Sequence, residues 1–441
     1  MVGRSSLRTV STKLERIAEL AREDPSRVLT TLAHHIDLDF LRAAHAQVRK
    51  DGAPGVDGET AASYAEALEE NLQDLLDRFK SGRYQAPPVK RAYIPKGEGK
   101  TRPIGIPTFE DKVLQTAVKL VLEAVYEEDF LACSYGFRPG RSAHQALDAL
   151  WQGLMDVGGG WVLDVDIRSF FDTLDHAHLR GFLDRRVRDG VLRRMIDKWL
   201  KAGVREGGEL SYPEEGTPQG GVISPLLANV YLHYVLDRWF EEEVRPRLRG
   251  RAVLVRYADD FVIVCAREDD AQRVMEVLPK RFSRFGLTLH PDKTRRVRFV
   301  RPRNGQDPEA GPRSESFDLL GFTHVWTRSR RGAWVVKRKT AKDRFRRCVK
   351  CIHQWCREHR HRKVAWQREA LERKLRGHYG YYGLTGNFKA LARFLRQVER
   401  AWQRWLNRRS QQRAMPWERF QRLLEHYPLP PPRIRRRATV A

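Results

Sequence analysis

The stretch Arg256-Tyr257-Ala258-Asp259-Asp260 lies between two apolar runs and places two carboxylates side by side. The run 252–255 leads into it and the run 261–265 follows it. Both runs are rich in Val and Ile, which favour strands over helices. Two strands joined by so few residues predict a β-hairpin with the carboxylates at its turn. For an isolated Asp-Asp pair a solvated turn would be the simpler explanation, so the surrounding motifs decide the interpretation.

The stretch 161–172, Trp-Val-Leu-Asp-Val-Asp-Ile-Arg-Ser-Phe-Phe-Asp, is the second place where carboxylates meet an apolar run. Strand alternation would place Val162, Asp164 and Asp166 on one face. Two acidic side chains on one strand face need a reason if that face is covered. Asp172, at the end of the stretch, is expected to cap the following helix.

The segment 216–229 joins a glycine-rich loop to a helix and reads Gly-Thr-Pro-Gln-Gly-Gly-Val-Ile-Ser-Pro-Leu-Leu-Ala-Asn. Gly220 and Gly221 permit close approach of the backbone to a ligand. Ser224 is expected to cap a helix whose first residue is Pro225. A glycine loop before a helix can also be a plain linker, and the residues alone leave both interpretations open.

A basic hairpin is expected over residues 87–107, where cationic and apolar residues alternate around a Gly-Glu-Gly turn. Charge on one face of such a hairpin can serve solubility alone. Lys and Arg can also neutralise the charge that develops on a triphosphate leaving group. The hairpin is therefore a candidate nucleotide clamp, and its cations are Lys90, Arg91, Lys96, Lys100 and Arg102.

The loop 134–144, Ser-Tyr-Gly-Phe-Arg-Pro-Gly-Arg-Ser-Ala-His, opens a helix in which Ser142 and Gln145 form a capping box. Arg138 and Arg141 in this loop could bind template or phosphate, or they could hold the loop itself, and the structural role is preferred. Helices are also expected earlier in the chain, over residues 1–48, 64–76 and 114–126.

Charge is distributed unevenly along the 441 residues, whose net charge is +26. Residues 1–300 hold 46 Lys and Arg against 45 Asp and Glu. Residues 301–441 hold 36 against 11, together with seven of the eleven Trp. A basic surface with interleaved aromatics suits a phosphate backbone and stacked bases. A solubilising face is the weaker explanation for an excess of this size, so the last third is expected to bind nucleic acid.

Hydropathy and cysteine content bear on the compartment. The chain has no long apolar run, so no membrane span is expected. Residues 1–10 lack the apolar core of a signal peptide. Five Cys without an even framework favour a reducing compartment, here expected to be the cytoplasm.

The last third combines basic helices with an aromatic bend. Helices are expected over residues 343–360, 366–376 and 388–405, and the glycine- and tyrosine-rich segment 377–387 is expected to be a bend between the last two. The tail 428–437 is expected to be extended, basic and unable to join a core.

Three cysteines in this third are candidate metal ligands. Cys348 and Cys351 have the spacing of a zinc-binding pair, but they lie with Cys356 in a helical run and no second pair follows. Buried thiols are the preferred interpretation.

Taken in order, these motifs resemble those of bacterial group II intron reverse transcriptase/maturase proteins, of the compact type without an endonuclease domain. The resemblance covers about residues 40–435. It implies an α+β fold: a right-hand polymerase with fingers and palm built on antiparallel sheet, followed by a helical thumb and maturase domain. The implied division has four parts. Residues 1–85 form an N-terminal helical extension with the start of the fingers, and residues 86–328 form the fingers and palm. Residues 329–427 form the thumb and maturase domain, and residues 428–441 form a basic tail.

The resemblance also assigns roles to residues. Asp166, Asp259 and Asp260 would hold two Mg²⁺ ions and carry catalysis. Lys293, in the motif 286–294, would be the general acid toward pyrophosphate, although a surface Lys is the commoner case. Nucleotide binding would fall to Lys96, Arg102, Phe171, Gln219 and Gly220.

Two of these assignments have a specific meaning. Phe171 would stack beneath the sugar and exclude a 2′-hydroxyl, whereas Phe170 is the better core candidate. The segment 317–322 resembles a motif that supports the primer strand. The segment 375–383 resembles the maturase domain, where intron RNA would contact Arg376, His378, Tyr379, Tyr381 and Tyr382.

The implied function is an RNA-directed DNA polymerase that binds its group II intron RNA, assists splicing and copies the intron during mobility. Its partners would be intron RNA, an RNA template with a DNA or RNA primer, deoxynucleoside triphosphates and a DNA target site. Two alternatives stay open: a domesticated reverse transcriptase, for example one serving defence, and an RNA-binding splicing factor with an inactive polymerase site. An RNA-dependent RNA polymerase is disfavoured because Phe171 should reject ribonucleotides.

Overall fold

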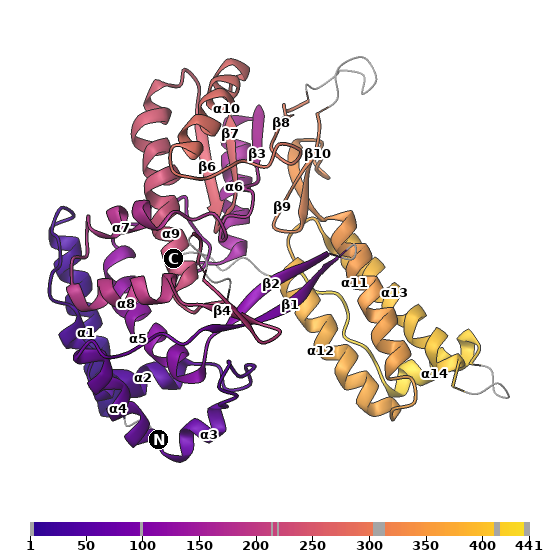
Figure 1. Cartoon of the computed structure of the whole chain (residues 1–441). Helices are drawn as coiled ribbons and strands as arrows, with labels where there is room; N and C mark the ends of the chain where they lie inside the picture. The colour runs from indigo at the N-terminus through magenta and orange to yellow at the C-terminus, as the bar shows by residue number, and fades with distance from the viewer. Residues whose placement is uncertain are drawn as a thin grey trace. The chain divides into compact units, whose positions relative to one another are not determined.

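The computed structural model describes residues 4–97, 100–212, 215–217, 220–302, 314–409 and 415–435, with side chains given for most of them. The chain divides into two compact units (Figure 1). Unit 1 comprises Met1–Ala146, Val165–Ile263 and Asp269–Arg295, and unit 2 comprises Leu147–Asp164, Val264–Glu268 and Arg296–Ala441. This two-part division is coarser than the four expected segments, whose boundaries stay a prediction.

The N-terminal part of unit 1 is helical, as the apolar spacing predicts. Both α1 and α2 pack against α5, whose residues Val113, Leu114, Ala117, Val118 and Val121 are fully buried. The helix expected over 64–76 is broken at Ala67 into two. The elements are α1 (Arg4–Glu23), η1 (Ala33–His35), α2 (Leu38–Gln47), α3 (Ala61–Glu66), α4 (Leu68–Lys80) and α5 (Phe109–Tyr126).

The basic hairpin expected over 87–107 is present as β1 (Val89–Gly97) and β2 (Lys100–Ile106), paired antiparallel. In Figure 1 it is a long two-stranded ribbon. The ribbon is widened by β4 (Val204–Glu206), which pairs parallel to β1, and by β5 (Glu209–Ser211), in the order β2-β1-β4-β5.

The hairpin expected around Asp259 and Asp260 is also present, as β6 (Ala252–Tyr257) and β7 (Asp260–Cys265). A four-stranded sheet has the order β6-β7-β3-β8, with β3 at Trp161–Val165 and β8 at Arg295–Arg298. Residues 261–265 of β7 are at most 1% exposed, so this strand is covered on both faces, which explains its unbroken apolar run. Helices complete the region: α6 (Ala143–Val157), α7 (His176–Leu183), α8 (Gly190–Leu200), α9 (Ser224–Leu232), η2 (His233–Asp237), η3 (Trp239–Val244), η4 (Arg245–Arg247) and α10 (Glu268–Ser283).

Two helix caps differ from the expectation. Asp175, rather than Asp172, accepts a hydrogen bond from the backbone N–H of His178 at the start of α7, because three more residues intervene before the helix begins. Ser224 is the first residue of α9 and not its cap, and its hydroxyl lies 2.8 Å from that of Thr217. The expected cap at Ser142 is present, since its hydroxyl accepts from the backbone N–H of Gln145 at 3.3 Å.

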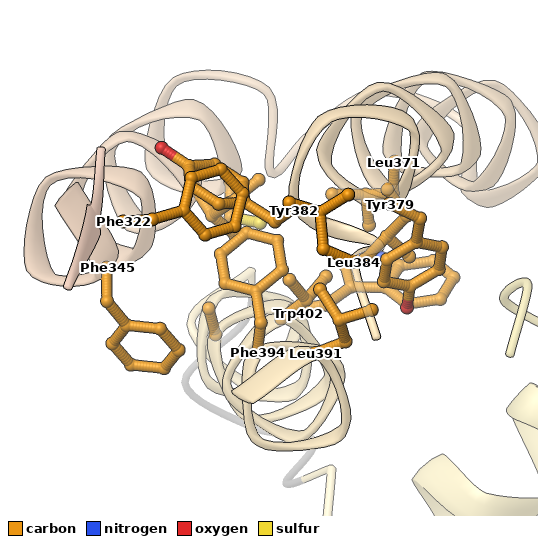
Figure 2. Packing of buried hydrophobic residues seen from close by; sticks show 14 of the residues in the cluster. Phe322, Phe345, Leu371, Tyr379, Tyr382, Leu384, Leu391, Phe394 and Trp402 are labelled. Atoms are coloured by element: carbon orange, nitrogen blue, oxygen red, sulfur yellow. The ribbon is translucent and has the colours of Figure 1, made fainter. Parts of the chain in front are cut away.

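Unit 2 contains a small antiparallel sheet and a cluster of helices. The sheet has the order β11-β10-β9, formed by β9 (Phe317–Leu319), β10 (Phe322–Arg328) and β11 (Trp334–Thr340). The helices are α11 (Lys342–Glu358), α12 (Val364–Tyr382), α13 (Phe388–Asn407) and α14 (Trp417–His426). Their apolar faces enclose a core that includes Leu371, Leu391, Phe394 and Trp402, shown in Figure 2.

The segment 377–387 is not a bend over its whole length, because α12 continues to Tyr382 and ends at Gly383. Glycine lowers helix stability by only about 1 kcal/mol, and packing outweighs that cost. His378, Tyr379 and Tyr382 are buried in the core of unit 2. The structure therefore places these three rings, expected on an RNA-binding surface, against other side chains. Tyr379 and Tyr382 are drawn in Figure 2, and the ring centroid of His378 lies 3.8 Å from that of Phe394.

The tail also departs from the expectation, since Leu429 and Ile434 pack against the core of unit 2. Its backbone is held by hydrogen bonds: the Tyr379 hydroxyl donates to the Pro430 carbonyl at 3.2 Å, and the N–H of Arg435 donates to the Gly383 carbonyl at 2.7 Å. Extended, proline-rich chain can still bury isolated apolar side chains, although its composition does not favour a core of its own.

The cysteines of α11 are not uniformly buried. Cys356 is buried, Cys348 is half-buried and Cys351 is exposed, so the expectation of buried thiols fails for Cys351. Among the described residues, no helix is long and apolar enough to cross a membrane.

Candidate active site and nucleic-acid surface

The turn between β6 and β7 holds the two adjacent carboxylates. Ala258 has φ 58°, a left-handed conformation that the first position of a tight hairpin turn requires and that glycine usually supplies. A non-glycine residue there is strained, and such strain is concentrated at functional sites. Asp259 is half-buried and Asp260 is exposed.

Asp166 lies at the same end of the sheet as this turn. Strands β3 and β7 are neighbours, and a Cβ on Gly160, just before β3, would lie 2.3 Å from the carbonyl oxygen of Cys265, the last residue of β7. The start of β3 therefore faces the end of β7, so the strands run antiparallel. It follows that Asp166, just past the end of β3, lies beside the start of β7 at Asp260.

Asp166 has a direct partner in Lys293, whose ammonium lies 2.5 Å from its carboxylate. The N–H of His290 donates to the Asp166 carbonyl at 2.8 Å, which fixes the segment that carries Lys293. Both side chains are partly exposed, at 55% for Lys293 and 31% for Asp166, so the ion pair is solvated and can be exchanged for other partners.

The carboxylates suit a hard cation, because Mg²⁺ prefers oxygen ligands. Within the described residues, however, no group of three or more His, Cys, Asp or Glu side chains lies close enough to hold a metal as the side chains stand. The backbone brings Asp166 and the Asp259–Asp260 turn to one end of the sheet, while Lys293 occupies the Asp166 carboxylate.

The candidate nucleotide residues that the structure describes lie around residues 215–217 and 220–221. The N–H of Thr217 donates to the carbonyl of Phe171 at 2.7 Å. Gly220 has φ 117°, and a Cβ there would lie 2.4 Å from the carbonyl oxygen of Gly105 in β2, so only glycine permits this approach. Phe170 is buried and Phe171 is half-buried, as the sequence suggested.

Arginines of the basic hairpin interact electrostatically with Asp172, the residue that follows Phe171. Arg102 is exposed, and it acts with Arg91 on Asp172: burial raises the pKa of Asp172, while attraction to the two arginines partly opposes that rise. Gln219 and the side chain of Lys96 lie outside the described residues, so their expected roles stay predictions.

A buried relay behind the loop was missed from the sequence. The carbonyl oxygen of the Gln115 side chain accepts from the backbone N–H of Val222 at 2.7 Å and of Ile223 at 3.3 Å. The amide of Gln115 donates to the carboxylate of Asp111 at 2.8 Å, and burial raises the pKa of Asp111 to about 6. Polar residues in the apolar pattern of α5 were the signal that could have revealed it.

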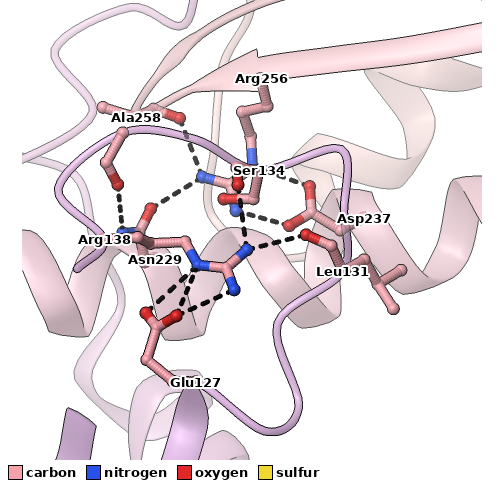
Figure 3. A network of polar contacts seen from close by, with 9 residues as sticks. Glu127, Leu131, Ser134, Arg138, Asn229, Asp237, Arg256 and Ala258 are labelled. Atoms are coloured by element: carbon pink, nitrogen blue, oxygen red, sulfur yellow. Dashed lines mark hydrogen bonds and ion pairs between the residues drawn. The ribbon is translucent and has the colours of Figure 1, made fainter. Parts of the chain in front are cut away.

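Two buried arginines support the β6–β7 turn and the loop beside it (Figure 3). Arg256 pairs with Asp237, and both side chains are fully buried. Arg138 pairs with Glu127 at 2.9 Å and donates to the carbonyls of Leu131 and Ser134 at 2.8 and 2.9 Å. The structural role preferred for Arg138 is therefore the one that it has.

The exposed charge of unit 2 forms a basic groove. A depression of about 400 Å³ has Phe345 and Val349 among its lining residues. Its cationic lining comes from α11 and α13 and consists of Arg346, Lys350 and Arg404. His353 also lines it, and burial lowers the pKa of that imidazole. Of the residues expected to bind RNA, Arg376 is 69% exposed and paired with Glu372, and the Tyr381 hydroxyl donates to the Leu320 carbonyl at 2.8 Å.

Comparison with known proteins gives a consistent result. The family described as Reverse transcriptase (RNA-dependent DNA polymerase) matches residues 94–324. Protein YkfC of Escherichia coli (strain K12) is 38% identical over 287 residues, covering 58% of this chain and 75% of that protein. Group II intron-encoded protein LtrA of Lactococcus lactis subsp. cremoris is 37% identical over 304 residues, covering 65% of this chain and 50% of that protein. Nuclear intron maturase 2, mitochondrial, of Arabidopsis thaliana is 26% identical over 284 residues, covering 53% of this chain and 36% of its own length.

Proposed function

This chain belongs to the reverse transcriptase family, and we propose that it is an RNA-directed DNA polymerase of the kind that group II introns encode. The observation that carries the proposal is the strained β6–β7 turn with Asp259 and Asp260, at the end of the sheet where Asp166 also lies. All three carboxylates belong to unit 1 and fall within the matched residues 94–324.

The reaction is phosphoryl transfer from a deoxynucleoside triphosphate to the 3′-hydroxyl of a primer. Asp166, Asp259 and Asp260 would hold two Mg²⁺ ions, which when bound stabilise the charge on the attacking and leaving oxygens. Lys293 has to leave Asp166 for this to happen. Its ammonium then lies near the departing pyrophosphate and can donate a proton to it.

The nucleotide is held from two sides. Arg102 on the basic hairpin would pair with the triphosphate, and the loop that contains Gly220 would close against it. Phe171 would lie beneath the sugar, where a ring leaves no room for a 2′-hydroxyl, so deoxynucleotides are the expected substrate.

The test is primer extension by the full chain on an RNA template with Mg²⁺. Wild-type protein should make DNA, and Asp259→Ala should make none. Phe171→Ala should gain ribonucleotide incorporation relative to wild type. Polymerisation by Asp259→Ala at the wild-type rate would overturn the proposal.

Binding of intron RNA is the second part of the proposed function. Its support is the excess of Lys and Arg in residues 301–441 and the groove that Arg346, Lys350 and Arg404 line. Phosphate contacts of this kind weaken as salt rises, with a slope set by the number of contacts. Bound RNA would be stabilised in its splicing-competent fold and later copied from the same complex.

The corresponding experiment replaces Arg346, Lys350 and Arg404 together by Gln and measures affinity for a group II intron RNA as a function of salt. Affinity and the salt slope should both fall, and splicing assistance should be lost. The matched control replaces Arg16 and Arg49, exposed arginines of unit 1, and should bind as wild type does. Equal affinities for the two variants would contradict RNA binding by this groove.

A further inference from the structure

Arg256 lies two residues before Ala258 in β6, yet its guanidinium is fully buried and reaches back to the β6–β7 turn (Figure 3). It donates to both carboxylate oxygens of Asp237, at 2.7 and 2.5 Å. One of its nitrogens, Nη1, also donates to the side-chain oxygen of Asn229 at 2.9 Å and to the carbonyl oxygen of Ala258 at 3.0 Å. A single guanidinium thus joins a helix, a strand and the strained residue of the turn.

The contact with Ala258 matters because that residue has φ 58°, a conformation that an alanine rarely adopts without external support. Gly136 packs closely against the turn from a second side, since a Cβ on Gly136 would lie 2.3 Å from the backbone nitrogen of Ala258. Asn229 fixes Gly136 in turn by donating to its carbonyl at 2.7 Å. Asn229 therefore connects both supports of the turn.

A change from α-helix to π-helix brings Asn229 and Asp237, the two helical partners of Arg256, toward the same side of the helix. Asn229 lies in α9, and Asp237, eight residues later, ends the π-helical segment η2. In a regular α-helix of 3.6 residues per turn, two residues eight apart are offset by about 80° around the axis. The wider turns of the π-helix reduce that offset, and π-helical turns are frequent at functional sites.

We propose that Arg256 is a positioning residue for the polymerase reaction: its guanidinium, anchored by Asp237 and Asn229, holds Ala258 in the left-handed conformation and so fixes the Asp259 and Asp260 carboxylates for metal binding. This inference rests on the proposed function for its catalytic meaning. The geometry of the turn and its effect on metal affinity can be tested without any polymerase assay.

The competing explanation is that Arg256 and Asp237 form a buried ion pair that only stabilises the fold. Unit 1 contains a matched example of such a pair. Arg186 is 2% exposed and lies 2.9 Å from Asp129. It donates to the carbonyls of Ala21, Asp24 and Arg27 and so holds the end of α1, a part of the chain remote in sequence from the β6–β7 turn.

The experiment compares the full-length variants Arg256→Lys and Arg186→Lys. A lysine at position 256 keeps the charge beside Asp237, but its single ammonium cannot also serve Asn229 and Ala258 in the geometry of the planar fork. A third variant combines Arg256→Lys with Ala258→Gly, because glycine adopts the turn conformation without support. Asp237→Asn, which keeps the shape of the carboxylate, serves as a milder variant if Arg256→Lys does not fold.

The first readout is Mn²⁺ binding followed by electron paramagnetic resonance, together with thermal unfolding of each variant. Arg256→Lys should weaken Mn²⁺ binding at least fivefold, and Asp237→Asn should weaken it in the same direction. Arg186→Lys should lower thermal stability without changing Mn²⁺ affinity. Adding Ala258→Gly to Arg256→Lys should restore at least half of the lost Mn²⁺ affinity on a logarithmic scale. A glycine at position 258 can do this only through the turn, because it does not replace the contact between residue 256 and Asp237.

Two results would overturn the inference: Mn²⁺ affinity of Arg256→Lys equal to that of Arg186→Lys, or no recovery in the double variant. The second readout, primer extension, separates this inference from the proposed function. If wild-type protein makes no DNA but Arg256→Lys still loses Mn²⁺ affinity, the proposed function fails and the positioning role stands. If wild-type protein polymerises and Arg256→Lys binds Mn²⁺ normally, the positioning role fails alone.

Discussion

Replacing Gln115 by Leu should damage nucleotide binding from a position inside α5. Gln115 is 3% exposed, and its side-chain oxygen is the acceptor for the backbone N–H groups of Val222 and Ile223. Leucine has a similar volume and suits the helix, so the change removes hydrogen bonds with little loss of packing. The loop that carries Gly220 would lose its anchor to α5.

The effect on the loop follows from the two N–H groups that lose their acceptor; loss of the hydrogen bond from Gln115 to Asp111 lowers stability further but does not act on the loop. A buried donor without a partner costs about 1–3 kcal/mol, and the Ile223 contact, at 3.3 Å, contributes less than the 2.7 Å contact of Val222. A total of about 2–3 kcal/mol is therefore expected. If about half of it is lost from nucleotide binding, KM for the deoxynucleotide rises roughly tenfold, since 1.4 kcal/mol corresponds to a factor of ten.

The assay is steady-state primer extension with a single deoxynucleotide, combined with thermal unfolding. The expected result is a higher KM with kcat changed less than about threefold, because the carboxylates are untouched. Gln367→Leu is the matched control: Gln367 is 1% exposed and donates to the carbonyls of His359, Arg360 and Arg362 in unit 2. A Gln115→Leu variant that loses stability but keeps the wild-type KM would refute the reasoning.

Three further outcomes are expected. Burial raises the pKa of Asp111 to about 6 from 3.8. The contribution of Asp111 to the free energy of unfolding is therefore fully present below pH 3.8 and is lost as pH rises through 6. Urea unfolding of unit 1 should give up to about 3 kcal/mol more stability from Asp111 at low pH, an effect absent in Asp111→Asn. Asp175→Ala removes the cap of α7 and should cost about 1 kcal/mol in thermal unfolding, whereas Asp172→Ala should cost nothing comparable. Trp402→Ala empties a fully buried site in unit 2 and removes the partner of Gln367. Chemical denaturation should show that the free energy of unfolding falls by about 3–5 kcal/mol. A fall below 1 kcal/mol would show that the core in Figure 2 is not well packed.

The sequence predicted those features that depend on local pattern. Both hairpins were predicted because alternation and tight turns are written in consecutive residues. The division of charge along the chain needed only counting. The role of Arg138 was also anticipated, because an arginine in a short loop has carbonyls within reach.

What the sequence could not predict depends on residues far apart in the chain. The pairing of Arg256 with Asp237 spans 19 residues and needs a π-helical register that no local pattern signals. The link from Asp111 through Gln115 to Val222 spans 111 residues and crosses from a helix to a loop. In α12 the glycines at 377 and 380 suggested a bend, yet burial of His378, Tyr379 and Tyr382 keeps the helix intact, which is tertiary packing overriding propensity.

The most direct test of the central claim is the single-turnover rate of one deoxynucleotide addition to a primer on an RNA template. Wild-type protein and Glu66→Ala, which changes an exposed carboxylate on α3, should add the nucleotide at similar rates. Asp259→Ala should show no addition above background. An Asp259→Ala rate equal to that of wild type would contradict the assignment of the β6–β7 turn as the catalytic centre.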